Sequence, residues 1–431
     1  MQSSSKIAII GGGISGLWLA RKLLVQGHTV TVFEKEEQSG GLLSGTDFCG
    51  RKIDRFYHFI CRADSTFQEE IRLFPSEKKF FWKEGKTANF INGKLYPFST
   101  PIDLMNFSPL PPLRRILFGM FTLSCRYRND WQKLDSITAL EWLEGALGKQ
   151  ALNSVFLPLL LFKFGPYYDK ISAAWMWHRI HRVAKSRWGL FGIEKYGMYG
   201  KGFYELISEL QLDIKRRGGK IITNTLIEQI SCNEGKASGL RFNKKIEKFD
   251  FIFSTIPLPA LCEILPEQYK GGLPKVEYLG VQCLLIGTKK PISPVFWLNL
   301  FHDGIPFNGI ITPDYLANEK PNIFVHYVPF YLSPSHPIFS YDTRELRNLV
   351  VPQLKNLFPE FRETELVDFQ SFKYSFAQPI CLVGFGNIKS HTVSGLRNFC
   401  FLDAAHLYPS DRTISGLMEK VADLSNSAFL S

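Results

Sequence analysis

The class of fold can be inferred from residues 6–34, which read KIAIIGGGISGLWLARKLLVQGHTVTVFE. Two short apolar runs, 6–10 and 28–33, flank a glycine loop and an amphipathic segment that ends at Gly27. Short runs rich in β-branched residues and bounded by glycine are typical of strands, and apolar residues at helical spacing indicate a helix. We therefore predict a strand, a turn, a helix and a second strand, with the acidic residue Glu34 directly after it.

Three glycines of the loop each have a mechanical reason. Gly11 allows the tight turn, Gly13 lets the backbone approach a pyrophosphate, and Gly16 lets the helix pack against the strand. A lone glycine motif is weak evidence. Framed by a strand, a helix, a second strand and an acid at the right spacing, it predicts a Rossmann-like βαβ unit that binds a dinucleotide.

The groups around the loop complete the predicted site. Ile14 and Ser15 open the helix, whose N-terminus presents free N–H groups and the positive end of its dipole to phosphates. Glu34 is placed to accept hydrogen bonds from ribose hydroxyls, and Lys35 follows it. We count all four among the predicted cofactor-binding residues.

A second glycine pair distinguishes between dinucleotides. The run Gln38-Ser-Gly-Gly-Leu-Leu-Ser44 places Gly40, Gly41 and Leu42 shortly after the acid. A second loop lets another backbone stretch approach a long dinucleotide whose isoalloxazine extends beyond the pyrophosphate. We therefore predict FAD as the cofactor.

With these two loops the chain resembles the flavin-containing amine oxidase and protoporphyrinogen oxidase superfamily, in which a spaced Gly-Gly follows the acid. Gln38 departs from the pattern, because an arginine is usual there. The resemblance covers nearly the whole chain and is closest to a bacterial subgroup of FAD-dependent, protoporphyrinogen oxidase-like oxidoreductases. The segments that carry it are 53–74, 93–104, 156–182, 199–210 and 296–313.

The resemblance implies further contacts to FAD. Residues 219–230 are similar to a strand pair that presents backbone to the adenine, here through Leu226 or its neighbour Ile227. Residues 398–417 resemble the final flavin-binding turn and helix, but Ala404 and Ala405 replace the usual Gly-Asp. Asp403 falls two residues early and is expected to face the core, so Asp411 is our candidate for the acidic contact or the helix cap.

Catalytic residues follow only as candidates. Tyr57 and His58 lie in the loop expected beside the flavin, where they could orient a substrate or move a proton. Lys163 interrupts an apolar run, so its ammonium needs a partner or an anionic substrate. Trp297 lies in a strand of the substrate domain. For each residue, ordinary packing is at least as common as a role in the site.

A basic and aromatic stretch predicts the substrate class. Residues 171–189 combine four cations with three tryptophans, and Arg179 is our candidate ligand. Basic groups beside indole rings suit a phosphate or carboxylate next to a ring or prenyl chain. The alternative is an amphipathic helix with a solvated basic face.

Composition excludes several classes. The formal charge is +11, but no compact basic block or nucleic-acid motif is present, so we expect no nucleic-acid partner. The eight cysteines form no C-x-x-C pair and indicate reduced thiols in a cytoplasmic protein. We expect no signal peptide, no membrane-spanning segment and no metal site.

The segment 111–128 is apolar with arginines at both ends. We favour a core helix with solvated ends. A helix lying in a membrane interface, which would bring the protein to the inner face of the membrane, is the alternative.

The predicted architecture is α/β and has two domains. A discontinuous, Rossmann-like FAD domain comprises residues 1–64, 196–271 and 386–431, and a mixed α+β substrate domain comprises 65–195 and 272–385. We expect an FAD-dependent oxidoreductase that transfers a hydride between flavin and a small-molecule or lipid-linked substrate. The alternatives are a non-redox flavoenzyme similar to UDP-galactopyranose mutases and a non-enzymatic escort protein of the same fold.

Overall fold

A five-stranded parallel sheet contains the N-terminal βαβ unit. The computed structural model describes residues 4–74, 77–187, 194–301, 304–307, 309–388 and 390–427. In spatial order the strands are β10 (Lys220–Ile222), β2 (Thr29–Phe33), β1 (Lys6–Ile10), β14 (Phe251–Ser254) and β20 (Phe399–Phe401). Because segments far apart in the sequence meet in one parallel sheet, the predicted Rossmann-like domain is confirmed as discontinuous.

Alternation along β1 explains how both faces of this sheet are covered. Ile7 and Ile9 pack on one face of the sheet, whereas Ala8 and Ile10 pack on the opposite face. The face with Ile7 and Ile9 is covered by α1 (Ile14–Val25), α9 (Phe203–Arg216) and α13 (Ile414–Ser427). The other side holds α10 (Leu258–Ile264) and a three-stranded antiparallel sheet of β11 (Gln229–Asn233), β12 (Lys236–Phe242) and β13 (Lys245–Lys248).

The predicted strand pair over 219–230 is wrong in one respect. Its first half is β10, which lies in the parallel sheet, and its second half begins β11, which pairs with β12. The two strands therefore belong to different sheets on either side of a short connection.

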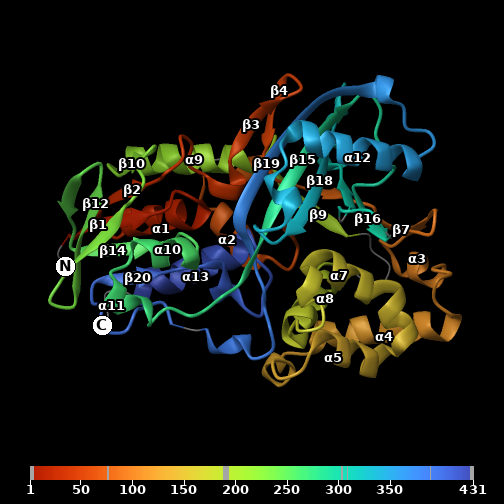
Figure 1. Cartoon of the computed structure of the whole chain (residues 1–431), viewed down its shortest axis with the longest axis horizontal. Coiled ribbons are helices and arrows are strands. Elements are labelled where there is room, and N and C mark those ends of the chain that lie inside the picture. Colours follow the sequence, from red (N-terminus) through yellow and green to blue (C-terminus); the bar gives the residue numbers. More distant parts are fainter. Residues whose placement is uncertain are drawn as a thin grey trace.

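The second large sheet of the protein has seven strands and lies beside the parallel sheet and its helices (Figure 1). In spatial order its strands are β19 (Leu366–Pro379), β15 (Tyr278–Thr288), β18 (Phe324–Leu332), β17 (Gly309–Ile311), β16 (Trp297–Phe301), β7 (Thr87–Ile91) and β8 (Lys94–Pro97). Helix α12 (Thr343–Leu357) covers one face of it. The opposite face turns side chains such as Val281 and Tyr331 toward the cavity described below.

A helical group lies beside this sheet, at the lower right of Figure 1. It consists of α3 (Pro101–Met105), α4 (Pro112–Tyr127), α5 (Ala139–Leu147), α7 (Leu157–Phe164) and α8 (Ala173–Ser186). These helices share one apolar core with Leu279 and Ile380, and this core fastens the group to the seven-stranded sheet.

Two smaller sheets join the parts. One is the hairpin of β3 (Gly45–Phe48) and β4 (Arg51–Asp54), and the other has the order β5 (Ile60–Cys61), β9 (Lys195–Tyr199) and β6 (Phe80–Glu84). The second draws strands from both predicted domains. The domain boundaries therefore stay predictions.

The expectation that residues 111–128 form a core helix is wrong. The segment is helical, as α4, but of this helix only Phe118 and Cys125 are buried. Five of its large apolar side chains are exposed. The sequence pattern could not distinguish these outcomes, because both faces of this helix carry apolar residues.

Candidate functional site

The first glycine loop has the geometry of a phosphate cradle. A Cβ atom added at Gly13 would meet no heavy atom within 4 Å, so this backbone borders open space. At Gly16 the same atom would lie 1.9 Å from the carbonyl oxygen of Gly11, so only glycine lets the loop and helix pack. Gly11 has φ +103°, a conformation that favours glycine. Each glycine thus has the structural setting predicted for it.

The second glycine loop is joined to the first. The amide of Gly40 donates to the carbonyl of Gly12 at 2.7 Å, and Gly40 and Gly41 both have positive φ. Gly13, Ile14, Ser15, Gly40, Gly41 and Leu42 all line one cavity. The first turn of α1 opens toward the same space, because Gly13 caps it with no side chain.

Glu34 lies at the end of β2 beside this loop. Its Oε2 accepts from the amide of Gly12 at 2.8 Å, and its Oε1 accepts from the amide of Glu36 at 3.0 Å. Each carboxylate oxygen keeps a further lone pair, which a ribose hydroxyl can use. The open cradle, the free helix N-terminus and this carboxylate together fit the adenosine diphosphate part of FAD.

Five predicted cofactor residues lie outside the cavity lining. Gly11, Gly16 and Glu34 shape or adjoin the first glycine loop, as described above, and the other two are Lys35 and Leu226. Lys35 is exposed and its Nζ lies 3.6 Å from Glu36. Leu226 is 62% exposed, whereas Ile227 is buried in the core. Thr225 donates its amide to the carbonyl of Glu34 at 2.8 Å, so the Leu226 backbone remains near the predicted adenosine site. Both roles stay predictions.

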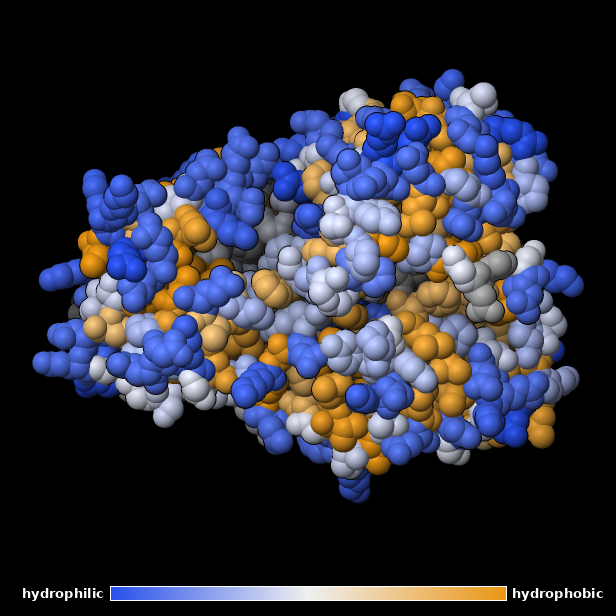
Figure 2. Space-filling model, in the orientation of Figure 1, coloured by the Kyte–Doolittle hydropathy of each residue, from blue (hydrophilic) through white to orange (hydrophobic). Residues whose placement is uncertain are grey.

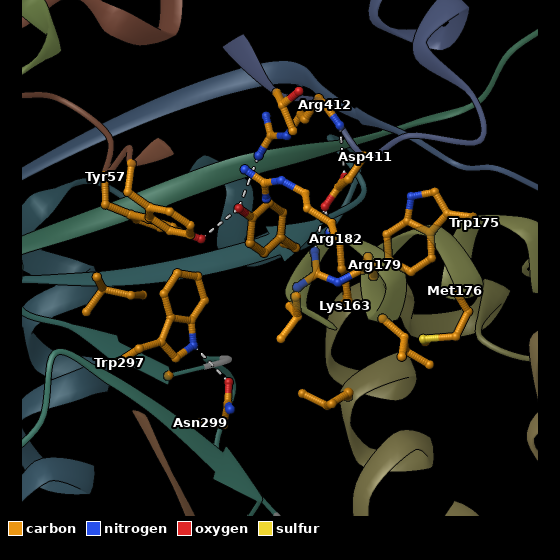
Figure 3. A pocket seen from close by; sticks show the side chains of 18 of the residues that line it. Tyr57, Lys163, Trp175, Met176, Arg179, Arg182, Trp297, Asn299, Asp411 and Arg412 are labelled. Carbon is orange, nitrogen blue, oxygen red and sulfur yellow. Dashed lines mark hydrogen bonds and ion pairs between the residues drawn. The ribbon is translucent and has the colours of Figure 1, made fainter. Parts of the chain in front are cut away.

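The cavity beyond the loops has a volume of about 910 Å³. It is bordered by residues of both predicted domains, and Figure 3 shows their side chains converging on it. Besides the loops named above, the predicted residues that line it are Tyr57, His58, Lys163, Arg179, Trp297 and Asp411. The structure therefore brings together the predicted cofactor loops and all the predicted catalytic and substrate residues.

Aromatic side chains form one wall of the cavity. The Tyr57 ring packs edge-on against Trp297 with centroids 5.2 Å apart, and its hydroxyl lies 2.9 Å from that of Tyr331. Burial raises the pKa of Tyr57 well above its ordinary value, with Tyr331 adding to the shift. Tyr57 is therefore a neutral hydroxyl that can orient a substrate.

His58 is held as a neutral ring. Its Nδ1 lies 2.8 Å from the carbonyl oxygen of Phe56, an acceptor, so Nδ1 carries the proton and Nε2 is left as an acceptor. Burial lowers the pKa of His58 to about 4. The ring is thus uncharged at neutral pH.

An ion cluster forms the opposite wall (Figure 3). Asp411 accepts from Lys163 Nζ at 3.3 Å and from Arg179 Nη1 at 2.5 Å. Burial by itself would raise the pKa of Asp411, but Lys163, Arg179 and Arg412 hold it well below its ordinary value. Asp411 is consequently ionised.

Two opposing effects determine the pKa of Lys163. Burial lowers its pKa to about 7, although Asp411 opposes the shift. Its Nζ also lies 4.7 Å from the centroid of Trp175 and 5.9 Å from that of Tyr331. Lys163 can therefore gain or lose its proton close to neutral pH.

Two further arginines enlarge the positive side of the cavity. Arg182 binds Asp64 through two hydrogen bonds, at 2.9 and 2.6 Å. Arg412 donates to the carbonyl of Ala377 and to the Tyr331 hydroxyl, and neither acceptor is charged. Both arginines line the cavity, so its cations exceed its acids. On α8, Arg179 and Arg182 line the cavity, whereas Lys185 is exposed, so binding of substrate by these cations stays a prediction.

Tyr331 and Arg412 belong to the site, although the sequence did not single them out as site residues. The spacing of Tyr327 and Tyr331 in one strand, which places both on one face, was a signal for the first. Arg412 follows Asp411 directly, but no local pattern shows where its guanidinium lies.

The C-terminal turn assigns different roles to its two acids. Asp403 accepts from the amides of Ala405 and Leu258 at 2.6 and 3.1 Å and from the hydroxyl of Tyr278 at 2.8 Å. It is buried, as expected, and it also lines the cavity. The carboxylate of Asp411 accepts hydrogen bonds from Lys163 and Arg179 of the ion cluster. Its predicted contact with flavin stays a prediction.

The part of the cavity bordered by the helical group has a mostly apolar lining, and we call it the apolar branch. Its lining comes from α3, α4, α7 and α8 and from the segment that precedes α7, and includes Leu104, Ile116, Met120, Leu123, Phe156, Leu159, Met176 and Ile180. The branch offers an anionic molecule a place for an attached hydrocarbon part. Within the described ranges, none of the helices combines the length and hydropathy needed to cross a bilayer.

Known proteins resemble this chain in sequence. The profile described as flavin containing amine oxidoreductase matches residues 14–408. A 1-hydroxycarotenoid 3,4-desaturase from Flavobacterium sp. (strain P99-3) is 32% identical over 155 residues, which are 33% of this chain and 29% of that protein. The chain spans less than two thirds of the length of the curated relatives that it matches first.

Solved structures share the fold. A putative protoporphyrinogen oxidase from Exiguobacterium sp. 255-15 matches with a TM-score of 0.78 and 16% identity, covering 100% of both chains. A reduced UDP-galactopyranose mutase matches with a TM-score of 0.73 and 16% identity, covering 99% of this chain and 96% of the other. At such identities the likeness concerns the fold, and it confirms the predicted fold class.

Proposed function

The chain belongs to the flavin containing amine oxidoreductase family, and on this basis we propose that it is an FAD-dependent oxidoreductase that takes a hydride from a long apolar substrate with an anionic group. Family membership also confirms FAD, the cofactor predicted from the two glycine loops. The observation that carries the proposal is the single cavity that joins these loops, the ion cluster and the apolar branch.

The cations support the anionic part of the proposal. Lys163, Arg179, Arg182 and Arg412 line the cavity. Lys163 and Arg179 are paired with Asp411, and Arg182 is paired with Asp64. An anion that enters can bind the Arg412 guanidinium, whose two hydrogen-bond acceptors are uncharged, and share Lys163 and Arg179 with Asp411. Trp175 beside Lys163 suits a ring or an unsaturated chain next to the charge.

When bound, FAD supplies the isoalloxazine ring that accepts the hydride. The chain's own residues position the substrate and exclude water. Tyr57 and Trp297 bound the reacting end of the cavity, and the neutral His58 offers Nε2 as an acceptor there. A proton that leaves the substrate with the hydride can pass to Nε2 of His58, the neutral acceptor at this end of the cavity.

The test uses purified protein loaded with FAD under anaerobic conditions. We expect prenyl phosphates and carboxylates of increasing chain length to bleach the oxidised flavin, and the matching neutral alcohols to do so more slowly. Equal rates for the charged and neutral members would contradict the anionic requirement. Rates that do not depend on chain length would contradict the role of the apolar branch.

A non-redox flavoenzyme is the second candidate, because the same cation cluster suits the diphosphate of a nucleotide sugar. The measurement that separates the two is the redox state of the product. Conversion of a sugar nucleotide to an isomer, only with reduced flavin and without net oxidation, would favour this candidate.

A further inference from the structure

The exposed side of α4 carries a continuous apolar stripe. Five of its side chains are between 42% and 72% exposed: Leu113, Ile116, Met120, Leu123 and Tyr127. The intervals of three and four residues place them on one side of the helix. Ile102 and Met105 of the adjoining α3 are also exposed, and we call these seven residues the α4 face.

The opposite side of the same helix fastens it to the protein. Phe118 stacks on Phe156 with centroids 5.5 Å apart, and Phe121 packs against Trp142 at 5.0 Å. The α4 face is therefore not a surface left open by a loosely attached helix. Figure 2 shows hydrophobic residues at the surface of the helical group, with hydrophilic residues around them.

Basic residues border the α4 face at both ends. Arg114 and Arg115 lie in the first turn of the helix, Arg126 lies in its last turn, and α4 contains no acidic residue. Arg114 donates to the carbonyl oxygen of Leu147, and Arg115 donates to those of Leu110 and Met105. Because these acceptors are uncharged, the bonds do not neutralise the positive charges of the two arginines. An apolar strip between cations complements the phosphates and acyl chains of an anionic membrane.

The α4 face also surrounds an opening of the cavity. Met105, Ile116, Met120 and Leu123 are exposed and at the same time line the cavity. A protein partner seated here would close that opening. A lipid layer would cover the same apolar side chains and still exchange apolar molecules with the cavity.

We propose that the α4 face docks on the surface of an anionic phospholipid bilayer, so that the apolar branch opens directly into the lipid. The docking itself does not depend on which reaction the flavin performs. A failure of docking would therefore leave the anaerobic flavin test, carried out with dispersed substrate, unaffected.

The experiment measures flotation of the FAD-loaded full chain with vesicles of phosphatidylcholine, with and without phosphatidylglycerol. We expect binding to the anionic vesicles that weakens as salt rises. The test variant is Leu113→Glu with Tyr127→Glu, because these two residues belong to the α4 face but do not line the cavity. Its vesicle affinity should fall about tenfold or more, since each new carboxylate opposes an anionic surface.

A matched control carries Leu212→Glu and Ile246→Glu. These side chains are exposed apolar residues of α9 and β13, and the control adds the same charge far from α4. It should bind vesicles within about twofold of the unchanged protein, because uniform net charge contributes less than charge at the contact. The milder pair Leu113→Ala with Tyr127→Ala should show a smaller loss, and retained flavin shows that each variant is folded.

Three results would overturn the proposal. The first is no flotation of the unchanged protein with anionic vesicles. The second is an equal loss in the test pair and in the control. The third is a protein dimer, seen without lipid, that the test pair dissociates, because this would make the α4 face a contact between two copies.

Discussion

Asp411 and Arg179 are 232 positions apart in the chain and form an ion pair of 2.5 Å at one wall of the cavity. The pair places a cation of α8 beside the C-terminal turn that precedes α13. Since Asp411 also binds Lys163, the carboxylate holds two cations in the position where we propose that the substrate anion binds.

Replacing Arg179 tests whether this cluster binds substrate. Arg179→Ala should raise KM for the anionic substrate about tenfold, because a hydrogen bond to a charged group contributes about 1.5–3 kcal/mol. Flavin content and Tm should change little, since Asp411 keeps Lys163 as its partner. Arg344→Ala on the exposed side of α12 is the control for steady-state kinetics, and equal kinetics in both variants would refute the role.

The pH dependence of KM tests Lys163. Its pKa is lowered to about 7, so the ammonium is charged below that pH and the amine is neutral above it. KM for the anionic substrate should therefore rise as the pH increases through 7. Lys163→Arg should remove this rise, because the guanidinium keeps its charge. A rise that persists in Lys163→Arg would assign the titration to another group.

Gly13→Val tests the phosphate cradle. The new side chain would enter open space in the protein but occupy the volume that the pyrophosphate needs, so FAD should be lost almost completely. Tm of the FAD-free protein should stay close to that of the unchanged protein without FAD. Gly145→Val, in an exposed and equally open position of α5, is the matched control and should retain flavin.

Glu34→Ala tests the ribose contact. Loss of charge-assisted hydrogen bonds of about 1.5–3 kcal/mol together should weaken FAD binding about ten- to a hundredfold. Glu34 also accepts from two backbone amides, so part of the effect could come from the loop. Titration of the FAD-free protein with FAD measures the affinity, and its melting temperature without FAD isolates the contribution of the loop.

His326 predicts a loss of stability in acid. It is completely buried between the hydroxyls of Thr288 and Thr312, and burial lowers its pKa to about 3. Its unfolded form titrates near pH 6.5, so below that pH the unfolded state binds more protons than the folded state. The unfolding free energy should fall by about 1.4 kcal/mol per pH unit from this group. Urea unfolding between pH 6.5 and 4.5 measures the slope, which should be shallower in His326→Gln.

The βαβ unit and its cofactor could be predicted from the sequence because its determinants are local. The strand predicted at 6–10 matches β1 in both bounds, and the second strand differs by one residue. Gly11, Gly13 and Gly16 act on neighbours within a few residues, so their spacing already contains the geometry of the turn. By contrast, the outcome for one residue of the aromatic stretch predicted over 171–189 is not given by the structure, because Trp188 lies outside the described residues.

The residues of the proposed substrate site, in contrast, come together only through tertiary packing. Lys163, Arg179, Tyr331 and Arg412 lie on α7, α8, β18 and the C-terminal turn, and only packing of these elements brings them together. The apolar pattern of α4 was visible in the sequence, but its exposure was not. Periodicity shows which residues share a side of a helix, whereas burial depends on whether a distant segment covers that side. Local sequence therefore determined the cofactor site, and long-range packing determined which side chains surround the rest of the cavity.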